Sequence, residues 1–193
     1  MARIVGLQLE GGGGVAGLAA SVGLRRKGHH VIVLESTSSL QTLGGSLLIP
    51  PSAARVLDSY ALWEAFKPSE SIPPGNTTYR YEDGSVLEDV RYDAMAKTFG
   101  YPIMAIPRAK YQWMLYEAAA KEGVEVRLSS RIKSIDEGAP AVILVNREMV
   151  EWDVIIGADG EIISKRLVVI LGGATEQLQS FHYYEFLPTG TLP

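Results

Sequence analysis

Three glycines near the N-terminus and one glutamate after them have the types and the spacing needed to bind the diphosphate and the ribose of a nucleotide. Gly12, Gly14 and Gly17 fit the pattern G-x-G-x-x-G. In a phosphate-binding turn the first glycine lets the chain reverse sharply, the second lets the backbone approach the phosphates, and the third lets the following helix pack closely on a strand. Glu35 lies 23 residues after Gly12, a spacing at which an acid can accept hydrogen bonds from both hydroxyls of an adenosine ribose.

The sequence around these residues predicts the elements that such a turn requires. Residues 3–9 are an apolar run typical of a buried strand, residues 15–27 have helical periodicity, and residues 30–34 (HVIVL) are a β-branched run. A strand, a glycine turn, a helix and a second strand within about 30 residues predict a βαβ unit. The backbone N–H groups at the start of the helix, around Val15 and Ala16, would then face the bound anion.

A flexible structural turn is the alternative interpretation, because glycine-rich turns are common. We favour dinucleotide binding because the strand, the helix and the acid all stand in place, and an acid at position 35 favours a free ribose, as in FAD or NAD. Glu10 disagrees with this interpretation, because a carboxylate in a buried strand would be desolvated and close to the diphosphate. Either the strand ends before Glu10, or the phosphate site is compromised.

The remainder of the chain continues an α/β pattern with one interruption. Helices are expected over residues 52–66 and 107–122. Short strands are expected over residues 124–128, 131–135, 141–145, 149–152 and 154–156. Asp83-Gly84, between two alternating runs, predicts a β-hairpin. The expected fold class is therefore α/β: a Rossmann-like domain with a parallel sheet, its βαβ unit and an inserted antiparallel β-hairpin region.

The composition excludes several classes of protein. The net charge of −4 argues against a nonspecific nucleic-acid binder, which needs a basic surface. The sequence has no cysteine, which excludes disulfides and thiolate metal sites, and its three histidines have no metal-ligand spacing, so we expect no metal. No apolar run is long enough to span a bilayer, and the N-terminus lacks the features of a signal peptide. A cytoplasmic protein without a membrane span is therefore expected.

Four segments together resemble the class A FAD-dependent aromatic hydroxylases, the group of salicylate hydroxylase and p-hydroxybenzoate hydroxylase. The segments are GGGGVAGLAASVGLRRKGHHVIVLE, LGGSLLIPPSAARVLDSYALWEAF, IPRAKYQWMLYEAAAKEGVEVRL and DVIIGADG. The resemblance covers residues 3 to about 166 and is closest to fungal salicylate-hydroxylase-like monooxygenases. It implies an oxidoreductase, a flavoprotein with FAD as its cofactor, NADPH or NADH as a transient co-substrate, and a small aromatic molecule as the substrate hydroxylated with O2.

The resemblance also implies which residues contact FAD. Gly12, Gly14 and Gly17 would hold the diphosphate and Glu35 the ribose. Arg108 would contact FAD, its alternative being a solvated charge at the start of a helix. Asp159-Gly160 would serve FAD and the visiting NADPH, its alternative being a simple Asp-Gly turn after a strand. No catalytic residue can be named.

Several departures from the family pattern make turnover uncertain. The family's D-G-x-x-S-x-x-R motif has Ile163 in place of its serine, with Ser164 one position later, and keeps only Arg166. Lys110 stands where the family usually has an acid, two residues after the arginine. The family's second half also supplies a Gly-Asp motif, and this sequence contains no Gly-Asp dipeptide. Family members are about twice as long as this chain. We therefore expect a chain truncated to the N-terminal half.

The domain division expected from this comparison has three parts. Residues 1–70 and 101–170 form the FAD-binding domain, residues 71–100 are a hairpin remnant of a substrate domain, and residues 171–193 are a tail of unknown role. The alternatives in function are a non-catalytic Rossmann-like module with weak or no FAD binding, and an NAD-linked dehydrogenase, for which no catalytic acid or base is visible. The oligomeric state and the identity of the substrate stay unknown.

Overall fold

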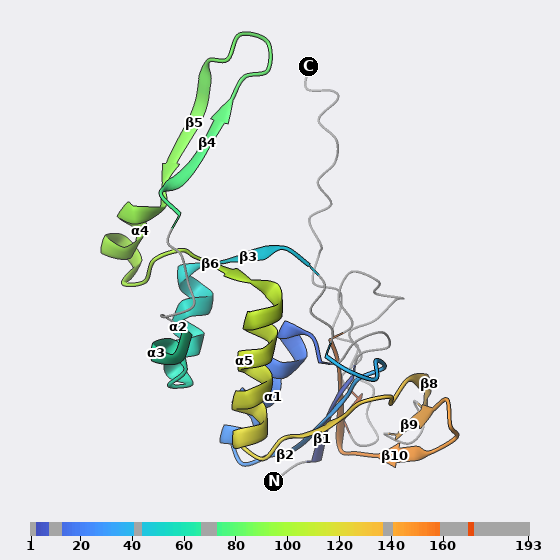
Figure 1. Cartoon of the computed structure of the whole chain (residues 1–193). Helices are drawn as coiled ribbons and strands as arrows, with labels where there is room; N and C mark the ends of the chain where they lie inside the picture. The colour runs from blue at the N-terminus through green and yellow to red at the C-terminus, as the bar shows by residue number, and fades with distance from the viewer. Residues whose placement is uncertain are drawn as a thin grey trace.

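A five-stranded sheet lies at the centre of the structure, a computed structural model that describes residues 3–7, 13–40, 44–66, 73–136, 141–158 and 170–171 (Figure 1). Its strands, in the order β12-β11-β1-β2-β7, span Ile170–Leu171, Val154–Gly157, Arg3–Leu7, His30–Leu34 and Glu125–Arg127. Strands β11, β1, β2 and β7 are parallel, and β12 is antiparallel to β11. Helix α1 (Val15–Arg26) connects the parallel neighbours β1 and β2, which confirms the predicted βαβ unit and α/β fold.

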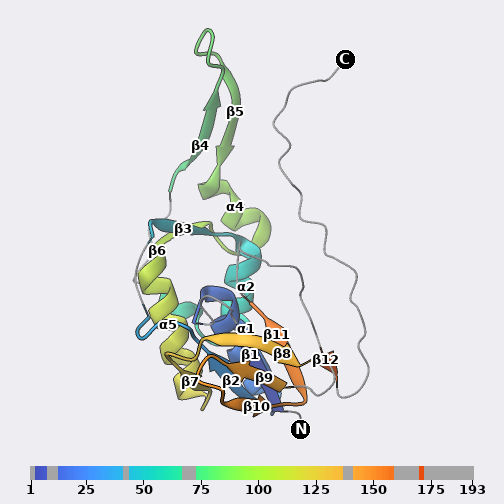
Figure 2. The same ribbon diagram turned by 90° about the vertical axis from the view of Figure 1, so that its right-hand side faces the viewer.

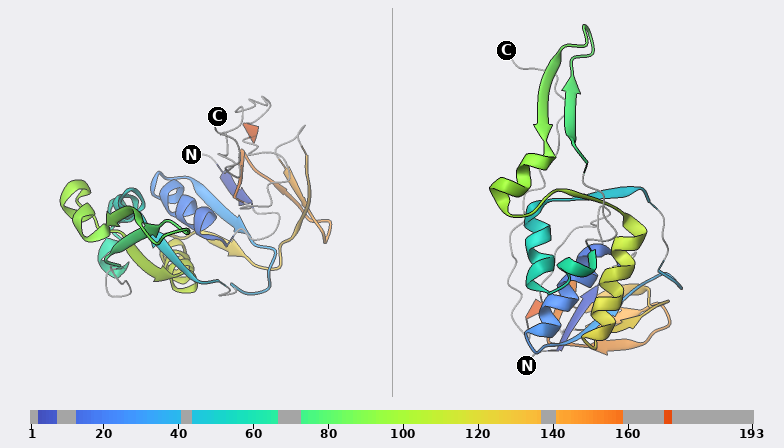
Figure 3. Two further views of the ribbon diagram at one scale, coloured as in Figure 1. Left: turned by 90° about the horizontal axis from the view of Figure 1, so that it is seen from above. Right: turned by 60° about the vertical axis from the view of Figure 1, so that its left-hand side comes forward.

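The sheet is the middle of three layers (Figure 3). Helices cover one face: α1, α2 (Pro51–Ser59), α3 (Trp63–Phe66) and α5 (Arg108–Lys121). A three-stranded antiparallel sheet covers the other face, with β8 (Ile132–Asp136), β9 (Ala141–Leu144) and β10 (Met149–Glu151). The parallel strands are therefore shielded from water on both sides, as parallel sheets usually are.

Strand β2 shows how the layers are held together. Its side chains alternate between the faces, because successive residues of a strand point to opposite sides. Val31 and Val33 belong to the hydrophobic core under the helices, whereas Ile32 and Leu34 belong to the core under the three-stranded sheet. A continuous β-branched run is the pattern that a strand buried on both faces requires, and it places the end of β2, with Glu35, inside the molecule.

A β-hairpin extends from the body of the molecule (Figure 2). Strand β4 (Gly75–Tyr79) pairs antiparallel with β5 (Val86–Arg91), and Gly84 between them has a φ of +71°. The predicted hairpin at Asp83-Gly84 is confirmed. The short helix α4 (Tyr92–Phe99) follows it, and the antiparallel pair β3 (Ser46–Ile49) and β6 (Met104–Pro107) joins this region to the helical layer.

The single helix predicted over residues 52–66 is wrong, because two helices, α2 and α3, occupy this range. Helix α2 ends where Ala61 adopts a left-handed φ of +54°. The N–H of Leu62 donates to the carbonyl of Leu57 (2.9 Å) and the N–H of Ala61 donates to that of Asp58 (2.8 Å), the hydrogen bonds of a Schellman motif. The resulting turn lets Trp63 and Phe66 reach the core, a tertiary contact that the helical periodicity of the sequence did not reveal.

Within the part of the chain that the structure describes, no helix is both long enough and apolar enough to cross a membrane.

A substitution of Leu115 on α5 tests the packing between the helices and the sheet, because this residue is 0% exposed. We expect Leu115→Ala to lower the free energy of unfolding by about 2–5 kcal/mol, the cost of a cavity in a packed core. Leu48→Ala is the matched control, since Leu48 is 54% exposed, and its expected change is below about 1 kcal/mol. Urea unfolding of both variants gives the two values, and equal losses would contradict the assignment of Leu115 to the core.

Candidate nucleotide-binding site

Glu35 follows β2 at the carboxyl end of the parallel sheet, the edge where open α/β sheets bind their ligands. Its main chain is fixed on both sides, because its N–H donates to the carbonyl of Arg127 (2.9 Å) and its own carbonyl accepts from the N–H of Ser130 (2.8 Å). The residue is only 2% exposed. A buried carboxylate needs compensating hydrogen bonds.

The carboxylate of Glu35 receives these hydrogen bonds from two directions. Oε2 accepts from the backbone N–H of Gly13 (2.6 Å), directly before α1. Oε1 accepts from the backbone N–H of Thr37 (2.8 Å) and lies 2.9 Å from the hydroxyl of the same residue and 3.4 Å from that of Ser36. The Thr37 hydroxyl also lies 2.7 Å from the carbonyl of Ser39. Since a hydroxyl carries one proton, Thr37 can donate to either oxygen and can leave Oε1 open to another donor.

Helix α1 begins beside this carboxylate. Gly14 is its N-cap residue, with an extended backbone (φ −69°, ψ 167°) and no side chain to cap the helix. The first helical hydrogen bond runs from the N–H of Leu18 to the carbonyl of Gly14 (3.0 Å). The N–H groups of the first turn, at Val15, Ala16 and Gly17, precede this bond and have no partner within a regular helix. No acidic residue lies in the first turn, so no side chain of that turn opposes an anion at the positive end of the helix dipole.

The hydrogen bond from Gly13 to Glu35 joins the two halves of the predicted site. It places the ribose-binding candidate directly beside the start of α1, the phosphate-binding candidate. The loop is also closely packed, because a Cβ atom added at Gly13 would meet the side chain of Leu40 and would lie 3.1 Å from Oε2 of Glu35. A buried acceptor for hydroxyls beside a row of amide donors fits the adenosine diphosphate half of FAD.

Arg108 is the first residue of α5, directly after β6, and its side chain is exposed. Its N–H donates to the carbonyl of Gly45 (3.0 Å). Its aliphatic stem lies beside Gly44, where an added Cβ would be 3.1 Å from Cδ and where φ is +128°. The pairing of β3 with β6 therefore holds Arg108 against Gly44 and Gly45. Contact between Arg108 and FAD stays a prediction.

Several residues named from the sequence lie outside the described residues. They are Gly12, Asp159 and Gly160 of the predicted cofactor site, together with Glu10, Ile163, Ser164 and Arg166. The two interpretations of Glu10 therefore both stay open.

Three residues that sequence reasoning missed take part in the network around Glu35: Gly13, Thr37 and Gln112. Gly13 occupies a variable position of the glycine pattern, and Thr37 lies in an unremarkable polar run. Gln112 on α5 donates a hydrogen bond from Nε2 to the carbonyl of Gly13. Its position four residues after Arg108 was the one available signal, because residues four apart lie on the same face of a helix.

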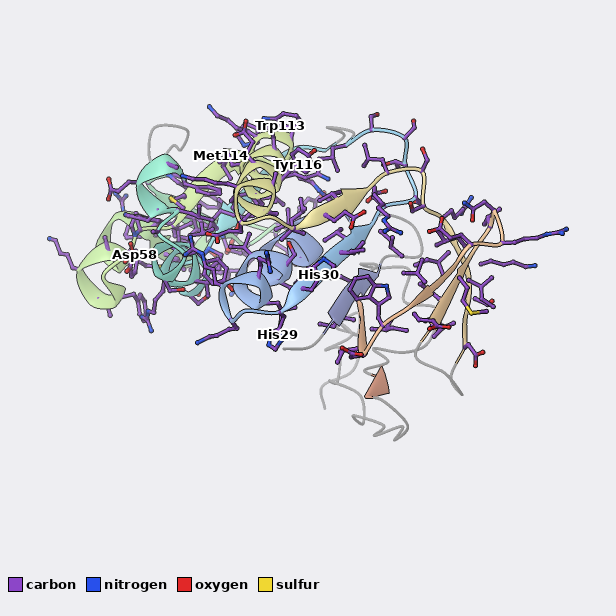
Figure 4. All side chains as sticks on the ribbon, turned by 90° about the horizontal axis from the view of Figure 1, so that it is seen from below. His29, His30, Asp58, Trp113, Met114 and Tyr116 are labelled. Atoms are coloured by element: carbon purple, nitrogen blue, oxygen red, sulfur yellow. The ribbon has the colours of Figure 1, made fainter. Side chains whose placement is uncertain are left out.

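Outside the candidate site, His30 and Tyr111 make packing contacts with other aromatic side chains. His29 and His30 lie where the chain passes from α1 into β2 (Figure 4), and the ring of His30 stacks on that of Trp152 with centroids 5.4 Å apart. Tyr111 packs edge-on against Phe66 in the core, and its burial raises the pKa of the phenol. Among the described residues, no group of three or more potential ligands could hold a metal ion.

Comparison with known proteins assigns the chain to a family. Residues 11–167 match the family described as "FAD binding domain". The chain belongs to this family. The resemblance to FAD-dependent hydroxylases that the sequence predicted is thereby confirmed, and FAD is the cofactor for which this domain is named.

The relatives that the chain matches are named as a monooxygenase, a hydroxylase and an oxygenase. The chain is 32% identical over 152 residues to the FAD-dependent monooxygenase OpS4 of Beauveria bassiana (strain ARSEF 2860), covering 77% of this chain and 36% of that protein. It is 29% identical over 192 residues to 3-hydroxybenzoate 6-hydroxylase 1 of Aquipseudomonas alcaligenes, covering 96% of this chain and 48% of that protein. A solved structure of 2-methyl-3-hydroxypyridine-5-carboxylic acid oxygenase superposes with a TM-score of 0.67 and 25% identity, covering 82% of this chain and 39% of that chain.

The chain thus spans between about a third and a half of the length of the curated relatives that it matches.

Proposed function

We propose that the chain is the FAD-binding portion of a flavin-dependent monooxygenase that hydroxylates an aromatic or related small molecule with NAD(P)H and O2. The observation that carries this proposal is the hydrogen bond between Gly13 and Glu35, because it places a candidate ribose acceptor beside the N-terminus of α1, where Gly14 supplies no side-chain cap. The relatives named FAD-dependent monooxygenases, and the one named as a hydroxybenzoate hydroxylase, support this reading over a non-catalytic module.

The chain's own residues would bind and orient the nucleotide half of the cofactor. The amides of Gly14, Val15, Ala16 and Gly17 would receive the diphosphate at the positive end of α1. Glu35 would accept hydrogen bonds from the ribose hydroxyls: Oε2 has one described partner, and Thr37 can release Oε1 by turning its hydroxyl to Ser39. Gly12, Arg108, Asp159 and Gly160 complete the proposed cofactor site. Bound FAD would supply the redox chemistry, accepting a hydride from NAD(P)H and activating O2.

Titration of FAD into the purified chain tests the proposal. We expect saturable binding of one FAD per chain with a Kd in the micromolar range or tighter, followed by flavin absorbance and by isothermal calorimetry. ADP should compete with FAD, because the described contacts belong to its adenosine diphosphate half. A chain that binds neither ligand would rule out the proposal.

Substrate turnover is a separate question from cofactor binding. The alternative is a non-catalytic Rossmann-like module, favoured by Ile163, which stands where the family has serine. Substrate-stimulated oxidation of NADPH or NADH, above the rate with free FAD, would exclude the non-catalytic module.

The remaining assignments also belong to this proposal. Residues 1–70 and 101–170 would form the FAD-binding domain, residues 71–100 would be an inserted β-hairpin that is the remnant of a substrate domain, and residues 171–193 have no proposed role. The sequence contains no cysteine, which supports a reducing compartment such as the cytoplasm.

A further inference from the structure

We propose that Gln112 is a positioning residue for the nucleotide: by holding the carbonyl of Gly13, it fixes the direction of the Gly14 amide and the position of the Glu35 carboxylate. This inference rests on the proposed FAD site. Gln112 lies on α5, 99 positions from Gly13 in the sequence, and its Nε2 donates to the Gly13 carbonyl from a partly buried position. The carbonyl oxygen of Gly13 can only accept a hydrogen bond, so Gln112 must direct its NH2 group toward it.

The geometry of the peptide bond carries the effect to Gly14. The carbonyl of Gly13 and the N–H of Gly14 belong to one planar unit, in which a trans peptide directs the two groups to opposite sides. No cis peptide bond occurs among the described residues. Because Gln112 holds the carbonyl toward α5, the N–H of Gly14 points away from α5. The N-cap amide then has a defined direction before any ligand binds, which reduces the ordering cost of binding.

The same loop residue connects Gln112 to the ribose acceptor. Gly13 accepts from Gln112 through its carbonyl and donates to Oε2 of Glu35 through its N–H (2.6 Å). A shift of Gly13 would therefore displace the start of α1 and the carboxylate of Glu35 together. Gln112 itself need not touch the nucleotide, and its influence passes through the backbone of Gly13.

Two substitutions at position 112 test the inference. Gln112→Met removes the donor with little change in volume, and Gln112→Glu replaces the donor with a carboxylate that repels the Gly13 carbonyl. We expect the Kd values for ADP and for FAD to rise together, about tenfold for Gln112→Met and more for Gln112→Glu. Binding of FMN, which lacks the adenosine, should change less than twofold. Glu117→Gln, at an exposed position of the same helix, is the control and should bind all three ligands as the wild-type chain does.

Thermal unfolding of the ligand-free chains separates positioning from a purely structural role. An increase in the Kd for ADP at an unchanged unfolding temperature supports the inference, whereas a lower unfolding temperature with an unchanged Kd overturns it. Unchanged affinity in both variants, in a wild-type chain that binds ADP, also overturns it and leaves the proposed function intact. A wild-type chain that binds neither ADP nor FAD removes the proposed function first and this inference with it. If Gln112→Glu does not fold, Gln112→Met decides the outcome.

Discussion

Replacement of Glu35 with alanine is expected to weaken FAD binding by about 100-fold or more. The substitution removes a charged acceptor from the ribose hydroxyls, and hydrogen bonds to charged groups contribute about 1.5–3 kcal/mol each. It also leaves the N–H of Gly13, buried beside the carboxylate, without its acceptor. Isothermal calorimetry with FAD and with ADP measures the loss, which should be similar for the two ligands because both contain the ribose.

The control for Glu35 is Glu117→Ala, because Glu117 is an exposed glutamate on α5. Its removal should leave the Kd for FAD within about twofold. Glu35→Gln provides the intermediate step: it keeps the volume of the side chain, but its NH2 group cannot accept from Gly13 or Thr37, so an intermediate Kd is expected. Undiminished FAD binding by Glu35→Ala would show that the ribose lies elsewhere.

The substitution Gly13→Val is expected to raise the Kd for FAD by up to about 100-fold. Gly13 leaves space for the side chains of Leu40 and Glu35, and this substitution fills that space. A Cβ at this position would meet Leu40 and would crowd Oε2 of Glu35 at 3.1 Å, and the branched side chain of valine adds two more methyl groups. Overpacking of this kind costs about 1–3 kcal/mol, here concentrated on the residues that would hold the nucleotide.

Gly45→Val is the matched control for Gly13. A Cβ at Gly45 would have nothing within 4 Å, so a side chain there is tolerated. Gly13→Ala should fall between the wild-type chain and Gly13→Val, with the Kd for FAD rising about tenfold. Equal affinities for Gly13→Val and Gly45→Val would mean that the contact of Gly13 with Glu35 does not shape the site.

The sequence predicted features that depend on residues close together in the chain, and it missed several that depend on the tertiary structure. The acid at position 35 was identified from its distance to the glycine motif, and β2 begins and ends at the predicted residues, His30 and Leu34. The break between α2 and α3 was missed, since Ala61 adopts a left-handed conformation that its residue type disfavours. Helix α4 and the pairing of β3 with β6 were missed as well, because four-residue strands and an eight-residue helix carry little periodicity.

The sequence by itself determined the βαβ unit and the acid at the end of its second strand, because both depend on residues within about 30 positions of one another. Tertiary structure alone decided which neighbours orient that acid. Gln112 reaches Gly13 from a helix 99 positions away, and the pairing of β2 with β7 fixes the backbone of Glu35 from the opposite side. These contacts follow from the order of the strands and the packing of α5 beside α1, which no local pattern of residue types encodes.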